Sequence, residues 1–146
     1  MKTNEVAVII KEIKTVSIIG LGALGILVGQ RFAKQMPKEN LRIIADKDRI
    51  ERYRRDGIYS NGERCDFNFV LPEERTGPSD LIIFAVKYGA LEEAVRAVKN
   101  QVGPDTLFVS LLNGITSEDV IAQIYPREQI VYTVAQGMDA VNEGGR

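Results

Sequence analysis

Short apolar runs alternate with amphipathic stretches along most of this chain. The apolar runs show no strict period of two, which is typical of strands buried on both faces of a parallel sheet. We therefore predict five parallel strands, at Val16–Gly20, Leu41–Ala45, Leu81–Val86, Leu107–Leu111 and Ile130–Val134.

The segments between these runs have the 3.6-residue period of amphipathic helices. Ser117, followed by Glu118 and Asp119, is expected to cap the last of them. Strands that alternate with helices predict an α/β fold, a Rossmann-type doubly wound parallel sheet in a single domain. The predicted helices are Ala23–Gln35, Arg49–Asp56, Gly89–Gln101 and Ser117–Ile124.

One segment interrupts the alternation. Ile58–Val70 holds Asn61-Gly62 between two β-prone runs, which is a hairpin signal. We predict a small β-hairpin inserted between the second helix and the third parallel strand. The Rossmann domain is expected at residues 15–146, and residues 1–14 form an extension to which the sequence assigns no structure.

The amino-acid composition of the chain excludes some classes of function. The 146 residues include 19 Lys and Arg against 20 Asp and Glu, for a net charge of −1, so no basic excess points to nucleic acid. The apolar runs are too short to span a bilayer, and the N-terminus lacks the pattern of a signal peptide. We expect a cytoplasmic protein with no nucleic-acid or membrane partner.

The chain has no histidine and a single cysteine, Cys65. An internal disulfide is therefore impossible, and a histidine-based zinc site is excluded. We expect no bound metal. Cys65 is interpreted as a half-buried strand residue rather than a nucleophile, so acid–base chemistry must use Lys, Tyr, Asp or Glu.

Three glycines follow the first predicted strand at the spacing of the dinucleotide fingerprint. In Gly20-x-Gly22-x-x-Gly25, the first glycine permits a tight turn and the last permits close packing of helix on strand. Gly22 would let the backbone approach a pyrophosphate, which a Cβ would obstruct. The free amides of the first helical turn would face that pyrophosphate.

The second predicted strand ends at Asp46, roughly twenty residues past the glycines, where dinucleotide-binding folds contact the adenosine ribose. A carboxylate there accepts hydrogen bonds from ribose hydroxyls, which favours NAD and repels a 2′-phosphate. Lys47 and Arg49 follow directly and could bind that phosphate instead. The alternative is a solvated turn in which Asp46 or Asp48 caps a helix, and the sequence leaves the choice of cofactor open.

Two further polar residues follow buried strands. Lys87 comes just after one predicted strand. Asn113, which precedes Gly114, comes after the next predicted strand. In an open parallel sheet, ligands bind at that edge. Lys87 could contact the cofactor or a carboxylate substrate, and Asn113 could join a substrate or ribose network. A surface lysine and an Asn-Gly turn are the alternatives.

Three stretches, in this order and spacing, carry a family resemblance: IIGLGALGILVG, IIFAVKYGALEEAV and LLNGITSEDVI. They resemble the ketopantoate reductase family (2-dehydropantoate 2-reductase), from Thr15 to about Gly144. The shared signs are Ala-Leu before the last glycine, the Val-Lys pattern after a parallel strand, and Asn-Gly after the next.

The resemblance implies an oxidoreductase that reduces 2-dehydropantoate to pantoate with NADPH, a step of pantothenate synthesis. Lys87 would contact the cofactor, and Asn113 would lie between nicotinamide and substrate and orient both. Asp46 stands where the family often has an arginine for the 2′-phosphate, with Lys47 beside it, so NAD is also admitted. The pyrophosphate would be bound by Gly20, Leu21, Gly22, Ala23, Leu24 and Gly25.

Members of that family carry a second, helical domain, which supplies a general-acid lysine and a substrate-binding carboxylate. This chain reaches only the point where that domain begins. We expect it to be the N-terminal part of a longer enzyme, inactive alone, that takes a small 2-oxo acid and forms a homodimer. A natural stand-alone domain is the alternative.

Two other functions fit the same patterns. IIADKDRIERYRRDG resembles the nucleotide-sensing Rossmann modules that gate potassium transport, although the hairpin, Lys87 and Asn113 are not their pattern. The other alternative is a related reductase with a different 2-oxo or 3-hydroxy acid as its substrate.

Overall fold

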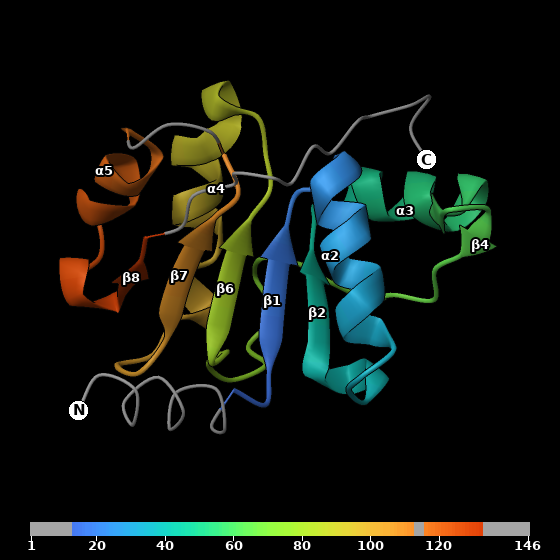
Figure 1. The fold of residues 1–146 in the computed structure, drawn as a ribbon, viewed down its shortest axis with the longest axis horizontal. Coiled ribbons are helices and arrows are strands. Elements are labelled where there is room, and N and C mark those ends of the chain that lie inside the picture. Colours follow the sequence, from blue (N-terminus) through green and yellow to red (C-terminus); the bar gives the residue numbers. More distant parts are fainter. Residues whose placement is uncertain (1–12, 113–115, 133–146) are drawn as a thin grey trace.

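A six-stranded parallel sheet forms the centre of the protein (Figure 1). The computed structural model describes residues 13–112 and 116–132. Helices lie on both sides of the sheet, as expected for the predicted doubly wound Rossmann-type fold. In spatial order the strands are β5 (Asn68–Val70), β2 (Leu41–Ile44), β1 (Val16–Ile19), β6 (Leu81–Phe84), β7 (Leu107–Ser110) and β8 (Ile130–Val131).

The chain starts its sheet in the middle and builds outward in both directions. Val16 of β1 pairs with Leu41 of β2 on one side and with Leu81 of β6 on the other. The connections therefore reverse direction between β1 and β6. In open parallel sheets, ligands bind at the carboxyl ends of the strands beside such a reversal.

Four α-helices lie within the described residues: α2 (Ala23–Ala33), α3 (Lys47–Asp56), α4 (Leu91–Ala97) and α5 (Thr116–Ala122). The start of α2 is as predicted, and α3 begins two residues earlier than predicted because Asp46 caps it. The predicted third helix is shorter than expected, since both of its ends are 3₁₀ turns. The cap assignment of Ser117 was wrong, because Ser117 lies inside the first turn of α5.

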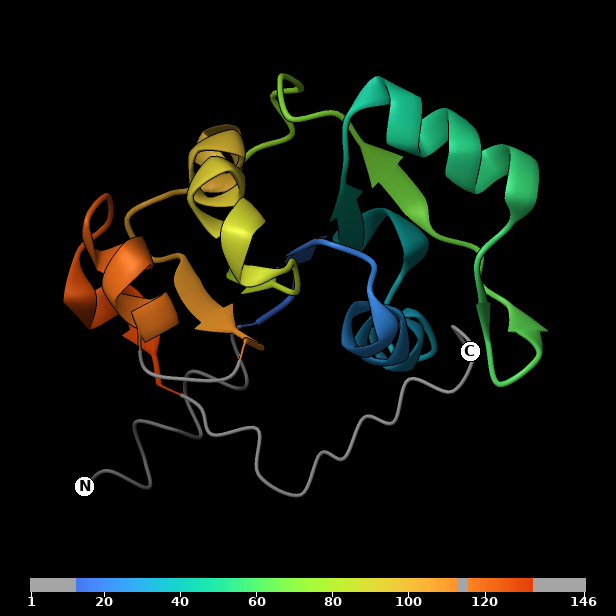
Figure 2. The same cartoon turned by 90° about the horizontal axis from the view of Figure 1, so that it is seen from above.

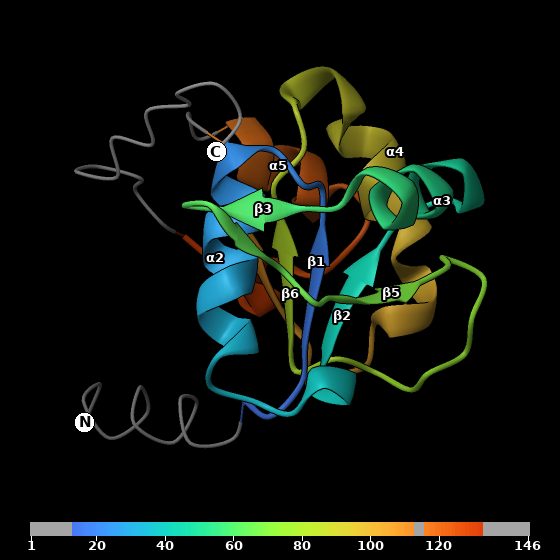
Figure 3. The same cartoon turned by 90° about the vertical axis from the view of Figure 1, so that its right-hand side faces the viewer.

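The predicted hairpin is confirmed, but it is smaller than expected. β3 (Tyr59–Ser60) and β4 (Glu63–Arg64) pair antiparallel through Asn61-Gly62, whose φ angles of 53° and 80° are those of a tight hairpin turn. The hairpin lies beside α2 (Figure 3). The end of the predicted segment instead forms β5, which pairs parallel with β2. The sheet therefore has a sixth strand, and the run at Leu81 is the fourth parallel strand in chain order.

Two hydrophobic cores cover the two faces of the sheet, beneath the helices that Figure 2 shows on either side of it. Alternate residues of β1 divide between them: Val16 and Ile18 face α2 and the hairpin, whereas Ile19 packs against the core under α4 and α5. The second core contains an aromatic stack in which the ring of Phe108 lies 6.2 Å from Phe84 and 4.7 Å from Tyr125.

A buried polar network closes the amino-terminal end of the sheet. Gln101 Oε1 accepts hydrogen bonds from the hydroxyl of Ser17 at 3.0 Å and from the guanidinium of Arg42 at 3.1 Å. Burial lowers the pKa of Arg42. Among the described residues, every buried side-chain nitrogen and oxygen has a hydrogen-bond partner. The hydrogen bonds among these buried polar side chains account for their presence inside the protein.

None of the helices in the described part of the chain is long and apolar enough to cross a membrane.

Replacing Phe108 with alanine should lower the free energy of unfolding by about 3–5 kcal/mol, because it leaves a cavity between two stacked rings. Urea unfolding monitored by circular dichroism measures this change. Lys99→Ala, at an exposed position, should change stability by less than about 0.5 kcal/mol. Equal effects of the two substitutions would contradict the assignment of this core.

Candidate dinucleotide-binding site

The glycine loop connects β1 to α2 and is pressed against the segment that follows β6. Gly20 has a φ of 104°, and a Cβ there would lie 2.6 Å from the carbonyl carbon of Ala85. At Gly25, a Cβ would collide with the carbonyl oxygen of Gly20. The protein's own packing therefore requires glycine at both positions.

Gly22 differs from its two neighbours in the motif. Among residues 13–112 and 116–132, a Cβ built there meets only the carbonyl oxygen of Ala85, at an ordinary 3.9 Å. Its φ of −76° and ψ of −170° are open to any residue. Neither packing nor backbone conformation explains this glycine, so the space at Gly22 is of the kind that an external group would fill.

The same residue is the N-cap of α2, and it offers no side chain to the helix. Within the described residues, no side chain caps the first turn of α2, and that turn contains no acidic residue. The first amides of a helix have no partner inside it. Together with the helix dipole, these amides favour an anion at this point. The loop therefore fits the diphosphate of a dinucleotide.

Hydrogen bonds between strand ends bring Lys87 to this edge. The amide of Ala85 donates to the carbonyl of Ile19 at 2.9 Å, and the amide of Leu111 donates to Phe84 at 2.9 Å. Lys87, two residues past Ala85, is exposed and begins a 3₁₀ turn. The glycine loop and Lys87 therefore share one edge of the sheet. Asn113 lies outside the described residues.

Asp46 stands at the carboxyl end of β2 and is the N-cap of α3. One carboxylate oxygen accepts the backbone N–H of Arg49 at 2.8 Å, and the other pairs with the Arg49 guanidinium at 2.8 Å. Lys47 is exposed in the first turn. The helix-cap interpretation of Asp46 is thus confirmed, and it does not prevent further hydrogen bonds, because each carboxylate oxygen has two lone pairs.

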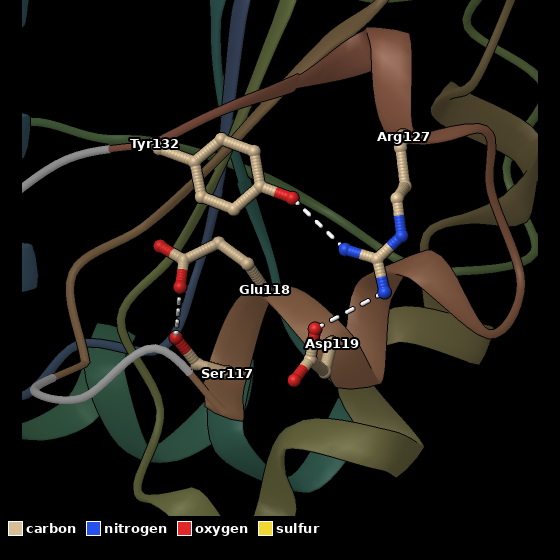
Figure 4. A network of polar contacts seen from close by, with 5 residues as sticks. All are labelled: Ser117, Glu118, Asp119, Arg127 and Tyr132. Carbon is tan, nitrogen blue, oxygen red and sulfur yellow. Dashed lines mark hydrogen bonds and ion pairs between the residues drawn. The ribbon is translucent and has the colours of Figure 1, made fainter.

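An ion-pair network fixes the elements beyond β7 (Figure 4). The guanidinium of Arg127 binds Asp119 of α5 at 3.1 Å and the hydroxyl of Tyr132 at 3.0 Å, which joins α5 to the end of β8. These contacts raise the pKa of Arg127. On the same helix Glu118 is buried, 2% exposed, with its carboxylate 3.4 Å from the hydroxyl of Ser117.

Sequence reasoning missed Ala85 as a positioning residue. Its backbone and Cβ lie against Gly20 and Gly25, so a larger side chain would push the loop away. The available signal was a small residue directly after three large apolar ones in the run at Ile82–Phe84. A small residue at a strand end marks a place where another segment comes close.

Other hollows of the surface lie away from this edge. Three shallow grooves of about 250, 270 and 310 Å³ lie around α2, the hairpin and α3, and none of them includes a residue of the glycine loop. Cys65 lines one of these grooves. It lies just past β4 and is 6% exposed, and burial raises the pKa of its thiol. A protonated, buried thiol is a poor nucleophile.

The strand order, the reversal between β1 and β6 and the glycine loop place this protein among the Rossmann-type α/β proteins. A more particular assignment comes from comparison with known families. The chain belongs to the ketopantoate reductase PanE/ApbA family, whose model matches residues 16–145.

Individual relatives agree with this assignment. The chain is 31% identical over 137 residues to 2-dehydropantoate 2-reductase of Streptococcus pyogenes serotype M1, covering 90% of this chain and 43% of that protein. The chain therefore spans less than half the length of the curated relatives it matches.

Solved structures show the same fold. A structure assigned as 2-dehydropantoate 2-reductase from Enterococcus faecalis is 28% identical, with a TM-score of 0.65 over 80% of this chain and 39% of that one. A D-mandelate dehydrogenase in complex with NADH and anilino(oxo)acetate is 26% identical, with a TM-score of 0.66 and the same coverage.

The two glycines at Gly22 and Gly25 should differ sharply in their tolerance of alanine. Gly25→Ala should lower the free energy of unfolding by about 3 kcal/mol, because its methyl group collides with backbone. Gly22→Ala should cost about 1 kcal/mol or less, since alanine fits there and is only a weaker helix cap. Urea unfolding of both variants checks this contrast. A Gly22→Ala protein that is the less stable of the two would refute the geometry described here.

Proposed function

We propose that this chain is the NAD(P)-binding domain of a reductase that acts on 2-dehydropantoate and yields pantoate. The observation that carries the proposal is the space at Gly22, which no described residue fills, at the start of α2, which no described side chain caps. The family match and the 31% identity to 2-dehydropantoate 2-reductase support the choice of reaction. The nicotinamide, when bound, supplies the hydride.

The chain's own residues would hold the reactants. The amides of the loop Gly20, Leu21, Gly22, Ala23, Leu24 and Gly25 bind the diphosphate. Lys87 adds a positive charge at the same edge, and Asp46 and Lys47 lie where β2 ends, toward the adenosine ribose. Asn113 positions the substrate carbonyl beside the nicotinamide. The proton for the product alkoxide comes from the second domain that the family resemblance implies, so we expect negligible turnover by this chain alone.

A related reductase with another 2-oxo acid is the second candidate. It is favoured by the D-mandelate dehydrogenase structure, which resembles this chain about as closely as the Enterococcus faecalis structure does and holds an oxo acid with NADH. The resemblance to the reductase family implies NADPH, whereas Asp46 admits NADH. Pantothenate synthesis as the pathway, a cytoplasmic location and a homodimer stay predictions.

Gly22→Val should abolish dinucleotide binding while the domain stays folded, because the side chain fills the space proposed for the diphosphate. We expect at least a hundredfold weaker binding of NADH and NADPH, or about 3 kcal/mol, in titrations of nicotinamide fluorescence. Circular dichroism and thermal melting serve as the control for folding. A folded Gly22→Val protein with unchanged affinity would overturn the proposed function.

The substrate assignment is tested with the dinucleotide bound. Adding 2-dehydropantoate should change the fluorescence of the bound reduced nicotinamide, and Asn113→Ala should weaken that response about tenfold or more, as expected for the loss of one or two hydrogen bonds. A phenyl-substituted 2-oxo acid tests the second candidate in the same assay. A nucleotide sensor would bind the dinucleotide and respond to neither acid.

A further inference from the structure

The carboxylate of Asp46 is held in place from two directions. Its contacts with the backbone N–H and the guanidinium of Arg49, both at 2.8 Å, use one lone pair on each oxygen. The side chains of Asp46 and Arg49 are 53% and 58% exposed. The pair is thus a fixed, solvent-facing arrangement with acceptor capacity left over.

This pair stands beside the glycine loop. Ile19 of β1 is in register with Ile44 of β2, so the loop after β1 and the turn at Asp46 leave the sheet side by side. Figure 1 shows α2 and α3 starting at the same edge of the sheet. A dinucleotide whose diphosphate lies at the start of α2 extends its adenosine ribose toward the end of β2.

We propose that the Asp46–Arg49 pair selects NADH over NADPH. This inference rests on the proposed function, because it presumes that a nicotinamide dinucleotide binds at the glycine loop. The free lone pairs of Asp46 accept hydrogen bonds from the ribose hydroxyls of NADH. Binding of NADH leaves the contact between Asp46 and Arg49 intact.

The charges at the start of α3 disfavour a 2′-phosphate. The four residues at this helix start, 46–49, are two acids and two bases in alternation, so their formal charges cancel and offer no net attraction to a dianion. The guanidinium of Arg49 keeps N–H donors beyond the one that Asp46 accepts, but the adjacent carboxylate offsets its charge, so its attraction to a phosphate is weak. The carboxylate of Asp46 would lie beside any phosphate that Arg49 bound and would repel it.

The substitution Asp46→Asn separates the charge of Asp46 from its role as a helix cap. Asparagine caps helices as well as aspartate does, so α3 should stay intact. The variant removes the negative charge and releases Arg49 for the phosphate. The matched control is Asp48→Asn, which removes an exposed carboxylate two residues further along the same helix turn.

The experiment titrates the chain with NADH and with NADPH separately, with nicotinamide fluorescence as the readout. The unmodified chain should bind NADH at least tenfold more tightly, as expected for hydrogen bonds to a charged group. In Asp46→Asn, NADH should bind about tenfold more weakly and NADPH more tightly, so that the preference reverses. Adding Arg49→Gln should remove the gain in NADPH affinity, and Asp48→Asn should keep the original preference.

Each result that differs from these expectations shows whether the inference or the proposed function fails. A preference of the unmodified chain for NADPH, or an unchanged ratio of affinities in Asp46→Asn, would refute this inference and leave the proposed function standing. The same holds if Asp48→Asn shifts the ratio as much as Asp46→Asn, because the effect would then be general electrostatics. If neither dinucleotide binds to the unmodified chain, the proposed function itself fails.

Discussion

The close contact between the glycine loop and Ala85 is the constraint on which the candidate site depends. Gly20 and Gly25 both lie so near their neighbours that a single Cβ would displace the loop or the segment after β6. α2 begins at the carboxyl edge of the sheet because it follows β1, and this contact places the loop before it against the residues that follow β6. Lys87 lies at the same edge, and among the described residues nothing but the carbonyl oxygen of Ala85, at 3.9 Å, approaches the position of a Cβ at Gly22.

The two ends of the sheet differ in how their polar groups are satisfied. At the amino-terminal end, Ser17, Arg42 and Gln101 bind one another inside the protein, which removes any need for an external partner. At the carboxyl end, no side chain in the described part of the chain caps the start of α2, and Lys87 is exposed to solvent. An anion bound there would accept hydrogen bonds from the first amides of α2, which have no partner inside the helix.

Asp46 shows how a structural role and a binding role can share one side chain. The carboxylate caps α3 and pairs with Arg49, yet both interactions leave lone pairs directed to solvent. Capping also fixes the position of the carboxylate charge relative to β2. A flexible surface carboxylate would have no such fixed position. From the sequence, capping the helix and contacting the ribose are alternative roles for Asp46, whereas the geometry allows both roles at once.

The sequence by itself determined five of the six parallel strands, the start of α2 and the hairpin turn at Asn61-Gly62, because apolar runs, glycine spacing and turn chemistry are local signals. Only the tertiary structure decided the rest. Asn68–Val70 became a strand because β2 offered an edge for pairing, and a three-residue run has no period of its own to reveal it. Likewise, the three glycines look equivalent in the motif. Only the packing of Gly20 against Ala85, and of Gly25 against the carbonyl of Gly20, distinguishes these two from Gly22.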